Sequence, residues 1–212
     1  VSLSAMTTSG TYNSNTWSVG ESHRAQSVQL EILGFNHDTL TTSTGGKTKA
    51  LITVDQKSCL MASGIDDTNG SSNGEHGYMN SSNTNSGGWT SCARRKWCNG
   101  AYYQALPEYL RTRVKPVNKL TSAGSQSATI NTDSDYVFLP SEIEIFGSVT
   151  YSKSGEGSQY TWFANAAANR YKSPHWNSSS VSDLWWERSP YSTSATYFCS
   201  VTTVGTATSG NA

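Results

Sequence analysis

The last thirty residues read Asp183-Leu-Trp-Trp-Glu-Arg-Ser-Pro190, followed by Tyr191-Ser-Thr-Ser-Ala-Thr-Tyr-Phe-Cys-Ser-Val-Thr-Thr-Val-Gly-Thr-Ala-Thr-Ser-Gly-Asn-Ala212. The first block is dense in aromatic and charged residues, which is typical of a core strand with an anchoring Arg. The second block consists mainly of small polar residues. This contrast indicates a rigid frame that displays a changeable binding face.

The composition limits the class of protein. The 212 residues suffice for one large domain with its own core. Only 14% of them are charged and the formal net charge is +0, so no long-range field attracts nucleic acid or an anionic membrane. No apolar run approaches the roughly 20 residues of a membrane span. We therefore expect neither a nucleic-acid partner nor membrane insertion.

Four cysteines, Cys59, Cys92, Cys98 and Cys199, permit three full pairings. None lies in a Cys-x-x-Cys unit, which disfavours a structural zinc site. Cys92 and Cys98 would lie on different faces of a continuous helix, which disfavours a bridge between them. We interpret all four as mostly buried thiols outside any disulfide, and we expect no metal and no cofactor.

Hydrophobic periodicity predicts strands and helices in an irregular order. Strands are expected around residues 28–34, 50–54, 136–139, 184–186 and 196–202. A helix is expected over 88–98, with Trp89, Cys92, Ala93 and Trp97 on one apolar stripe. Further helices are expected over 102–114, after a break at 99–100, over 141–147 with a Ser141–Glu144 capping box, and over 159–171. Because the two kinds are interspersed without a βαβ rhythm, the predicted class is α+β.

Two polar segments flank the first predicted strands. Residues 1–16 are rich in Ser, Thr, Gly and Asn and are interpreted as a linker or N-terminal arm, which leaves residues 17–212 as one domain. Residues 63–88 are nearly all Asp, Asn, Gly and Ser, which predicts a long surface loop. The oxygen-bearing side chains of this loop could bind a cation, although a solvated loop is the expected state; they belong to Asp66, Asp67, Asn69, Asn73 and Glu75.

The order of several motifs carries a resemblance. The motifs are Gly34-Phe-Asn-His-Asp38, Asn83-Thr-Asn-Ser-Gly-Gly-Trp89 with Arg94, Ala105-Leu-Pro107, Leu139-Pro-Ser-Glu-Ile-Glu-Ile-Phe-Gly147 and Trp185-Trp-Glu-Arg-Ser-Pro190. Over residues 17–212 they resemble a family of uncharacterised domains common in gut Firmicutes, their phages and prophages. These domains look like C-type-lectin-fold variable proteins, the targets of diversity-generating retroelements. The resemblance implies a distorted antiparallel sheet flanked by two helices with long loops, and a C-terminal face, about 191–212, that is mutated to bind new ligands.

The spacing of the family's variable positions implies which side chains are displayed. They are Tyr191, Thr193, Ser194, Tyr197, Ser200, Thr202, Thr203, Thr206, Thr208, Ser209 and Asn211. Phe198, Val201 and Val204 would pack inward as alternating strand residues. Randomised adenines in Asn codons cannot yield Lys, Glu, Gln, Trp or Met, and residues 191–212 contain none of these five.

The sequence departs from the family pattern at its end. Family members continue past the variable stretch into a final strand that resembles Gly-Val-x-Pro-Gly-Phe, whereas this sequence stops at Ala212. We expect either a truncated sequence or a last strand that is supplied otherwise, because an unpaired edge would weaken the sheet.

The residue types suit binding by a rigid scaffold. Tyr and Trp offer a large contact area for few frozen torsions, and Ser, Thr, Asn and Gly adapt their hydrogen bonds. Trp185 and Trp186 are interpreted as core aromatics that hold the scaffold. Arg188 is interpreted as a structural fork to a carbonyl or carboxylate.

Other classes of protein fit the sequence less well than a binding protein. A calcium-dependent lectin would need the Glu-Pro-Asn or Gln-Pro-Asp triplet, which is absent. An enzyme like the formylglycine-generating oxidases would need two nearby cysteines, but Cys199 is alone in the C-terminal third. His37 and Asp38 would point to opposite faces of a strand, so His37 is interpreted as a structural histidine.

The predicted function is therefore non-enzymatic. We expect a receptor-binding domain or adhesin at a phage tail tip or on a bacterial cell surface. It would recognise a host-surface protein or glycan, with the loop 63–85 beside the variable face and with a homotrimer as the assembly that supplies avidity. The alternative is a structural virion or cell-surface module of fixed specificity.

Overall fold

The computed structural model describes residues 9–12, 15–18, 30–57, 78–172 and 184–212. In these residues the strands pair antiparallel and form four small sheets. Two sheets are pairs: β1 (Ser9–Tyr12) with β2 (Asn15–Ser18), and β3 (Leu30–Phe35) with β6 (Ile52–Gln56). One has the order β5-β4-β7-β8, from Lys47–Lys49, Thr39–Thr44, Val117–Ser122 and Ile130–Asp135. The C-terminal sheet has the order β11-β10-β9, from Ala207–Asn211, Tyr197–Val201 and Trp185–Pro190.

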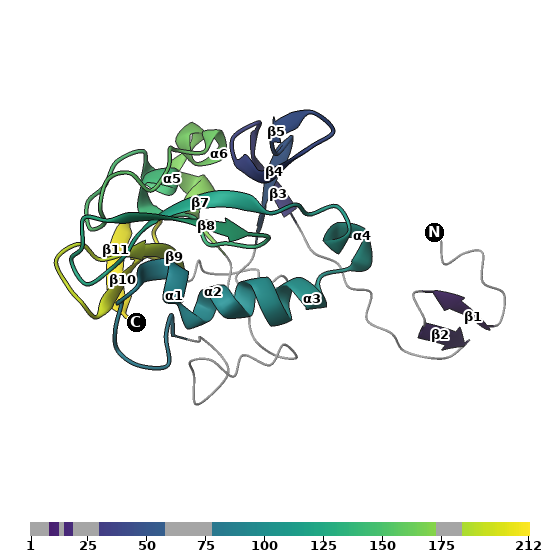
Figure 1. Cartoon of the computed structure of the whole chain (residues 1–212), viewed down its shortest axis with the longest axis horizontal. Coiled ribbons are helices and arrows are strands. Elements are labelled where there is room, and N and C mark those ends of the chain that lie inside the picture. Colours follow the sequence, from purple (N-terminus) through teal and green to yellow (C-terminus); the bar gives the residue numbers. More distant parts are fainter. Residues whose placement is uncertain (1–8, 13–14, 19–29, 58–77, 173–183) are drawn as a thin grey trace.

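The helices are short. They are α1 (Gly88–Ser91), α2 (Ala93–Trp97), a π-helical turn (Cys98–Tyr102), α3 (Tyr103–Ala105), α4 (Glu108–Arg111), α5 (Glu142–Phe146), α6 (Thr161–Asn165) and a 3-10 turn (Ala167–Arg170). Figure 1 shows α1–α3 along one side of the strands β7 and β8, with α5 and α6 on the opposite side. The predicted α+β class is confirmed, and the helix predicted over 159–171 corresponds to α6 and the 3-10 turn.

The helix predicted over residues 88–98 is interrupted at Cys92. This residue has extended backbone, with φ −62° and ψ 134°, and its thiol donates to the carbonyl of Met79 at 2.8 Å. The side chain of Asn80 then accepts from the backbone N–H of Ala93 at 2.9 Å and so begins α2. The break expected at residues 99–100 is wrong, because the π-helical turn carries the backbone through them into α3.

Helix α5 forms where local signals predict it. The hydroxyl of Ser141 accepts from the backbone N–H of Glu144, and the Glu144 carboxylate accepts from the backbone N–H of Ser141 at 3.1 Å. Gly147 ends the helix with φ 76°, a left-handed conformation that glycine adopts at little cost. The predicted capping box and helix end are both confirmed.

The strand predicted over residues 136–139 is wrong, because the strand is β8, six residues earlier. Its sequence Ile-Asn-Thr-Asp-Ser-Asp lacks apolar alternation, so periodicity could not identify it. Polar side chains hold it in place instead. The buried carboxylate of Asp135 accepts from the Trp89 indole N–H at 2.8 Å and from Arg95 Nε at 2.8 Å, which fastens α1 and α2 to the sheet.

The buried side chains of β3 do not alternate regularly along the strand. Leu33 is buried, whereas Ile32 is 45% exposed, because a bulge between Ile32 and Gly34 changes the register against β6. On the paired strand β6, Ile52 and Val54 are 49% and 45% exposed. The β3–β6 pair therefore presents apolar side chains to its surroundings.

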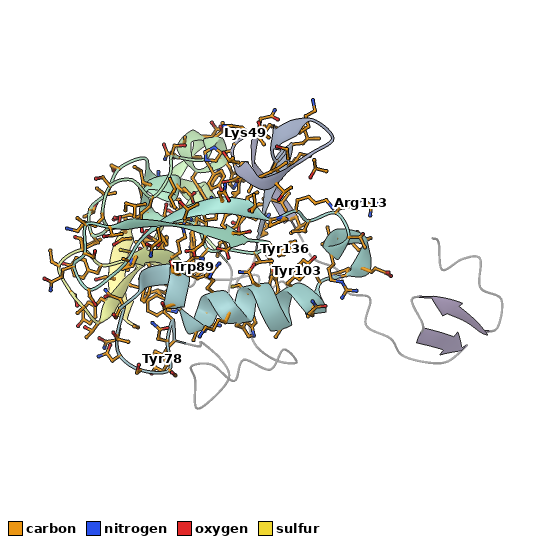
Figure 2. The ribbon with its side chains drawn as sticks, in the orientation of Figure 1. Lys49, Tyr78, Trp89, Tyr103, Arg113 and Tyr136 are labelled. Carbon is orange, nitrogen blue, oxygen red and sulfur yellow. The ribbon has the colours of Figure 1, made fainter. Side chains whose placement is uncertain are left out.

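Two apolar clusters form the core on the two faces of β10. One includes Trp89, Met79 and Phe198, and the other includes Tyr160 and Val201. Figure 2 shows Trp89 on α1, and farther along it shows Tyr103 beside Tyr136, whose rings stack with centroids 4.6 Å apart. Because Phe198 and Val201 are three positions apart on one strand, the central strand separates the clusters.

Two glycines test how tightly the loops are packed. Gly124 has φ +70°, and a Cβ there would lie 1.8 Å from the carbonyl oxygen of Asn85. Gly124→Ala should therefore lower the free energy of unfolding by more than about 2 kcal/mol. Gly100 lies in the π-helical turn with nothing within 4 Å of its Cβ position, so Gly100→Ala should stabilise by about 0.5–1 kcal/mol. Urea unfolding measures both, and equal effects would contradict the packing described.

Candidate functional site

Strand β10 lies at the centre of the C-terminal sheet and is covered on both faces. Four consecutive residues, Phe198 to Val201, are buried. The strand pairs with β11 on one side and with β9 on the other. A strand enclosed in this way fixes the backbone of the whole C-terminal segment, but it offers almost no side chains for display.

Two of the predicted orientations are wrong, for different reasons. Ser200 was expected on the displayed face, but its exposed fraction is 0%. Alternation displays every second residue only when one face of a strand is solvated, and β10 has no solvated face. Val204 was expected to pack inward, but it is 65% exposed, because the strand ends at Val201 and Val204 lies in the following turn. Phe198 and Val201 are buried as predicted.

The other predicted positions do not form one continuous face. Eight of them fall into two groups at opposite ends of β10. This strand has five residues and is therefore about 17 Å long. Thr208 and Ser209 lie between the groups on β11 and, as neighbours on a strand, point to opposite faces. The first group is Tyr191, Thr193, Ser194, Tyr197 and Asn211, and the second is Thr202, Thr203 and Thr206.

The first group gains a further aromatic residue that sequence reasoning missed. Tyr151, from the segment after α5, packs edge-on against Tyr191 with ring centroids 5.5 Å apart. Tyr191 in turn stacks on Tyr197 at 6.2 Å. We call the resulting surface the tyrosine surface and define it as Tyr151, Tyr191, Thr193, Ser194, Tyr197 and Asn211. Thr193 and Asn211 are exposed and the others are half-buried.

Buried Asn85 holds the backbone beneath the tyrosine surface. Its side-chain amide donates to the carbonyls of Ser194 at 2.8 Å and Tyr197 at 2.7 Å. Its backbone N–H donates to the carbonyl of Ala195 at 2.8 Å, and its side-chain oxygen accepts from the backbone N–H of Ser125 at 2.8 Å. Asn85 lies in the Asn83–Trp89 motif. The motif identified this segment in the sequence but did not show what the side chain of Asn85 does.

Glu142 supports the tyrosine surface from the other side. Its buried carboxylate accepts backbone N–H groups of Thr150 at 3.0 Å, Tyr151 at 3.1 Å and Ser152 at 2.7 Å. A carboxylate that receives several backbone donors in this way fixes a loop firmly. The Tyr151 backbone is therefore held by a side chain that does not itself reach the surface.

The second group forms a tight turn. Thr202 Oγ1 accepts from the backbone N–H groups of Val204 at 3.3 Å and Thr206 at 3.1 Å, and it lies 2.8 Å from Thr206 Oγ1. Gly205 has φ +72°, and a Cβ there would lie 2.5 Å from the Tyr171 ring. In this turn the side chain of Thr202 maintains the backbone, so Thr202 is framework as well as surface.

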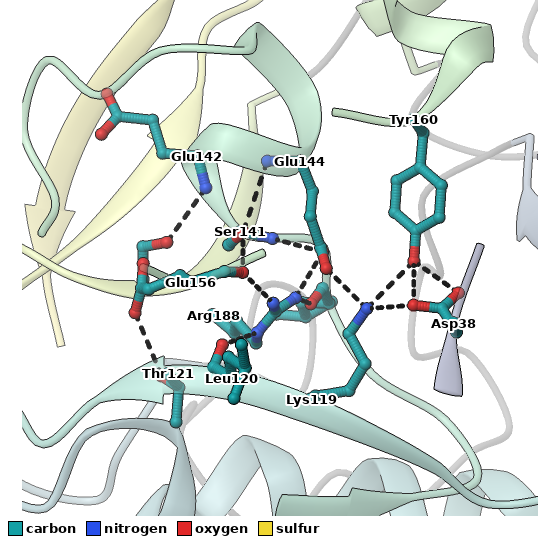
Figure 3. Close-up of polar contacts among 12 residues, drawn as sticks. Asp38, Lys119, Leu120, Thr121, Ser141, Glu142, Glu144, Glu156, Tyr160 and Arg188 are labelled. Atoms are coloured by element: carbon teal, nitrogen blue, oxygen red, sulfur yellow. Dashed lines mark hydrogen bonds and ion pairs between the residues drawn. The ribbon is translucent and has the colours of Figure 1, made fainter. Parts of the chain in front are cut away.

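Arg188 anchors β9 through a buried network, shown in Figure 3. Its guanidinium donates to the carbonyls of Leu120 at 3.1 Å, Leu139 at 2.9 Å and Glu156 at 2.8 Å, and to the Glu144 carboxylate at 2.6 Å. These are the carbonyl and carboxylate contacts expected of it. Burial raises the pKa of Glu144, but Arg188 and then Lys119 outweigh burial and hold that pKa below its ordinary value.

Asp38 belongs to the same network, which sequence reasoning did not foresee. Its carboxylate accepts from Lys119 Nζ at 2.7 Å, from Thr53 Oγ1 at 2.5 Å and from the Tyr160 hydroxyl at 2.8 Å. Burial raises the pKa of Asp38, but Lys119 and these hydrogen bonds outweigh it and lower the pKa overall. Its neighbour His37 stacks on the Tyr160 ring at 4.1 Å, which agrees with a structural histidine.

Trp185 and Trp186 occupy the positions expected of a scaffold. Trp185 is buried, donates from its indole N–H to the carbonyl of Arg170 at 3.0 Å and stacks on Phe163 at 6.3 Å. Trp186 is half-buried against the first core cluster. A Cβ on Gly210 would lie 3.0 Å from the Trp186 ring, which explains why β11 carries a glycine there.

The described cysteines agree with the predicted state. Cys92, Cys98 and Cys199 are buried, and Cys92 and Cys199 are free thiols, while Cys59 lies outside the described residues. Burial, reinforced by the charges of Glu187, Glu142 and Glu156, raises the pKa of Cys199 well above its ordinary value. Cys199 therefore remains a thiol near neutral pH and lacks the character of a reactive thiolate.

Within the described residues, no group of three or more His, Cys, Asp or Glu side chains is arranged to hold a metal ion. The cation candidates Asp66, Asp67, Asn69, Asn73 and Glu75 lie outside those residues. No helix in the described part of the chain has the length and apolar character needed to cross a membrane.

Glu187 on β9 carries an unusual buried carboxyl group. It is 0% exposed, and neither of its carboxylate oxygens has a hydrogen-bond partner among the described residues. Burial, followed by the nearby charges of Glu142 and Glu156, raises its pKa well above the ordinary value. Its surroundings therefore favour the neutral form of Glu187 over the carboxylate.

This state predicts a pH dependence. A group whose pKa is raised by folding contributes its full stability at pH values below its pKa in the unfolded chain, about 4.3. This contribution is lost as the pH rises through its pKa in the folded protein. Each proton released on unfolding in that window lowers stability by about 1.4 kcal/mol per pH unit. Glu187→Gln should remove this slope and stabilise the protein at alkaline relative to acidic pH. Urea unfolding across pH measures it, and the exposed Glu108→Gln should leave the slope unchanged; parallel slopes in wild type and Glu187→Gln would refute the assignment.

Comparisons with known proteins identify a family. Searches of curated proteins and of solved structures each found no match to the chain. The family described as "Domain of unknown function (DUF6273)" matches residues 49–212. The match includes the C-terminal sheet, Asn85 and the residues of the buried network except Asp38. Since it covers most of the sequence, the chain belongs to the DUF6273 family.

Proposed function

We propose that this domain is a non-enzymatic receptor-binding domain of a phage tail or bacterial surface protein, and that its tyrosine surface binds a host-surface protein or glycan. One observation carries the proposal. Three tyrosine rings and several small polar side chains lie together on backbone that is held by buried Asn85 and Glu142. Apart from Ser194, whose hydroxyl accepts from the backbone N–H of Thr196 at 3.2 Å, the groups that fix this surface are thus different from the groups that it presents.

The chemistry of the tyrosine surface supports recognition. Tyrosine supplies a large amphipathic contact area with only two torsions to freeze, and Thr, Ser and Asn adapt their hydrogen bonds to different ligands. A backbone that is already ordered pays little entropy on binding. The domain carries a net charge of +0, so recognition would depend on contact shape and hydrogen bonding more than on electrostatic steering.

The proposal includes a C-type-lectin-like fold diversified at its C-terminal end. The small antiparallel sheets, the helices on both sides of β7–β8 and the buried Trp185–Arg188 segment agree with such a fold. The exposed or half-buried state of every predicted variable position except Ser200 supports display. The two groups of positions lie at opposite ends of β10 and do not form one face. We assign ligand binding to the group that contains the tyrosine rings, which is the tyrosine surface.

A structural module of fixed specificity is the second candidate. The exposed apolar side chains of Ile32, Ile52 and Val54 favour it, because such a surface is stabilised when another protein surface covers it. A homotrimer at a phage tail tip would supply that cover and would also add avidity to binding by the tyrosine surface.

Population sequencing tests the diversification. The coding region for residues 160–212 should vary at adenines in the codons of the tyrosine surface, above all those of exposed Thr193 and Asn211. It should be invariant at buried Phe198, Ser200 and Val201, since replacement there would disrupt the core. The contrast between buried Ser200 and exposed Asn211 is the sharpest part of the test. Variation spread evenly over these codons, or none, would leave fixed specificity as the function.

A binding measurement tests the assignment to the tyrosine surface. Tyr191→Ala should reduce retention of the fluorescently labelled protein on intact bacterial cells from the source community by roughly 30-fold, as expected for loss of a central tyrosine worth about 2 kcal/mol. Thr203→Ala, at the other end of β10, is the matched control and should bind as wild type. Both variants should unfold at nearly the same temperature as wild type. Equal retention of Tyr191→Ala and wild type would contradict the assignment.

A further inference from the structure

Lys119 and Asp38 form an enclosed pair between distant parts of the chain. Lys119 Nζ lies 2.7 Å from Asp38 Oδ1, and the two side chains are 2% and 4% exposed. The residues are 81 positions apart. Asp38 follows β3, whereas Lys119 lies within β7, so any bond between them would join the N-terminal strands to the centre of the domain.

The surroundings of this pair are aromatic and dry. Lys119 Nζ lies 4.2 Å from the centroid of the Phe138 ring and 5.4 Å from that of Tyr160. Removing two charges from water into such a place is costly, and their mutual attraction repays that cost only in part. A low dielectric therefore reduces the free-energy difference between the ion pair and its neutral form, which is an amine beside a carboxylic acid.

The other groups are placed to assist a reaction between the two. Glu144 Oε1 lies 2.6 Å from the same Nζ and can take up a proton from it. The Tyr160 hydroxyl lies 3.0 Å and 2.8 Å from the two Asp38 oxygens, and Thr53 Oγ1 donates to Oδ2 at 2.5 Å. Donors directed at a carboxyl group polarise its carbon and stabilise the oxyanion that forms when an amine attacks.

We propose that Lys119 and Asp38 condense into an intramolecular amide, an isopeptide bond, with Glu144 as the proton carrier. One proton first passes from the Lys119 ammonium to Asp38 Oδ1, 2.7 Å away, which leaves an amine beside a carboxylic acid. The lone pair of Nζ then attacks Cγ of Asp38 and forms the Nζ–Cγ bond. Glu144 takes a second proton from Nζ and passes it to the departing hydroxyl of Asp38, whose bond to Cγ breaks as it leaves as water. An ammonium and a carboxylate thus become one secondary amide and one water, with no change in net charge and no oxidant or external reactant.

The charge balance of the network favours the product. Before condensation the site holds two cations, Lys119 and Arg188, beside two carboxylates, Asp38 and Glu144. Afterwards Arg188 and Glu144 remain as a one-to-one pair, with Nη1 and Oε2 2.6 Å apart. Condensation therefore removes one pair of buried charges and leaves the other fully compensated, which reduces the desolvation cost.

The location gives the bond a mechanical role. Strands β4 and β7 are joined through a short ladder at Leu40 and Val117. An isopeptide bond two residues from each of these strand positions would fasten the connection between β3 and β4 covalently to β7. In a domain exposed to pulling or proteolysis such a link maintains the fold when hydrogen bonds break.

A second buried lysine serves as the matched control. Lys172 Nζ also pairs with an aspartate, Asp55, and donates to the carbonyl of Gln56 at 2.7 Å. In the described part of the chain a single carboxylate, that of Asp55, pairs with it, so it lacks a group in the position that Glu144 occupies beside Lys119. We expect Lys172 and Asp55 to remain an ion pair.

Intact-mass spectrometry of the folded, purified chain after prolonged incubation at neutral pH tests the proposal directly. The mass should be lower than the sequence mass by one water. Tryptic digestion should yield residues 25–47 joined to residues 114–153, because an acylated Lys119 is not cleaved. The full sequence mass in a protein that unfolds cooperatively, with residues 120–153 released as a separate peptide, would overturn the proposal.

Variants separate the bond from the ion pair. Lys119→Arg keeps the positive charge but should show the full sequence mass, and Glu144→Gln should abolish or slow the loss of water. Lys172→Arg should still lack one water. If Lys119→Arg fails to fold, the wild-type mass and the joined peptide still decide the question. A loss of water that persists in Lys119→Arg would place the modification elsewhere and overturn the assignment.

Discussion

The carboxylate of Glu144 is the interaction on which the other parts of the domain depend. It caps its own helix through Ser141, pairs with Arg188 on β9 and pairs with Lys119 on β7. Loss of this one group would leave two buried cations short of a counter-charge, and breaking a buried pair in this way costs about 3–5 kcal/mol. Because β9 carries the adjoining β10, the position of the tyrosine surface follows from the same carboxylate.

The network also explains how a weakly charged sequence holds a large domain together. The chain has 15 Lys and Arg and 15 Asp and Glu. In the described part of the chain ten of them are buried, namely Asp38, Lys119, Asp133, Asp135, Glu142, Glu144, Glu156, Lys172, Glu187 and Arg188. These buried polar groups specify which strands and helices meet.

Sequence reasoning succeeded where the signal is local and failed where the structure depends on distant partners. The Ser141–Glu144 capping box and the inward Phe198 follow from spacing within one segment. The pairing of Asp38 with Lys119 spans 81 positions, and nothing local marks either residue. Strand β8 and the burial of Ser200 were missed because both depend on neighbouring elements. Asp135 of β8 is held by hydrogen bonds from Trp89 and Arg95. Ser200 is buried in a strand that pairs with β9 on one side and with β11 on the other.

The two ends of β10 differ in a way that bears on how the surface can change. In the turn after β10 the hydroxyl of Thr202 holds the backbone, so a new side chain there alters the shape as well as the chemistry. At the tyrosine surface the backbone is held by Asn85 and Glu142, which lie beneath it. A residue whose conformation is fixed by other residues can be replaced without moving its neighbours. The tyrosine surface therefore satisfies a physical condition for diversification that the turn does not.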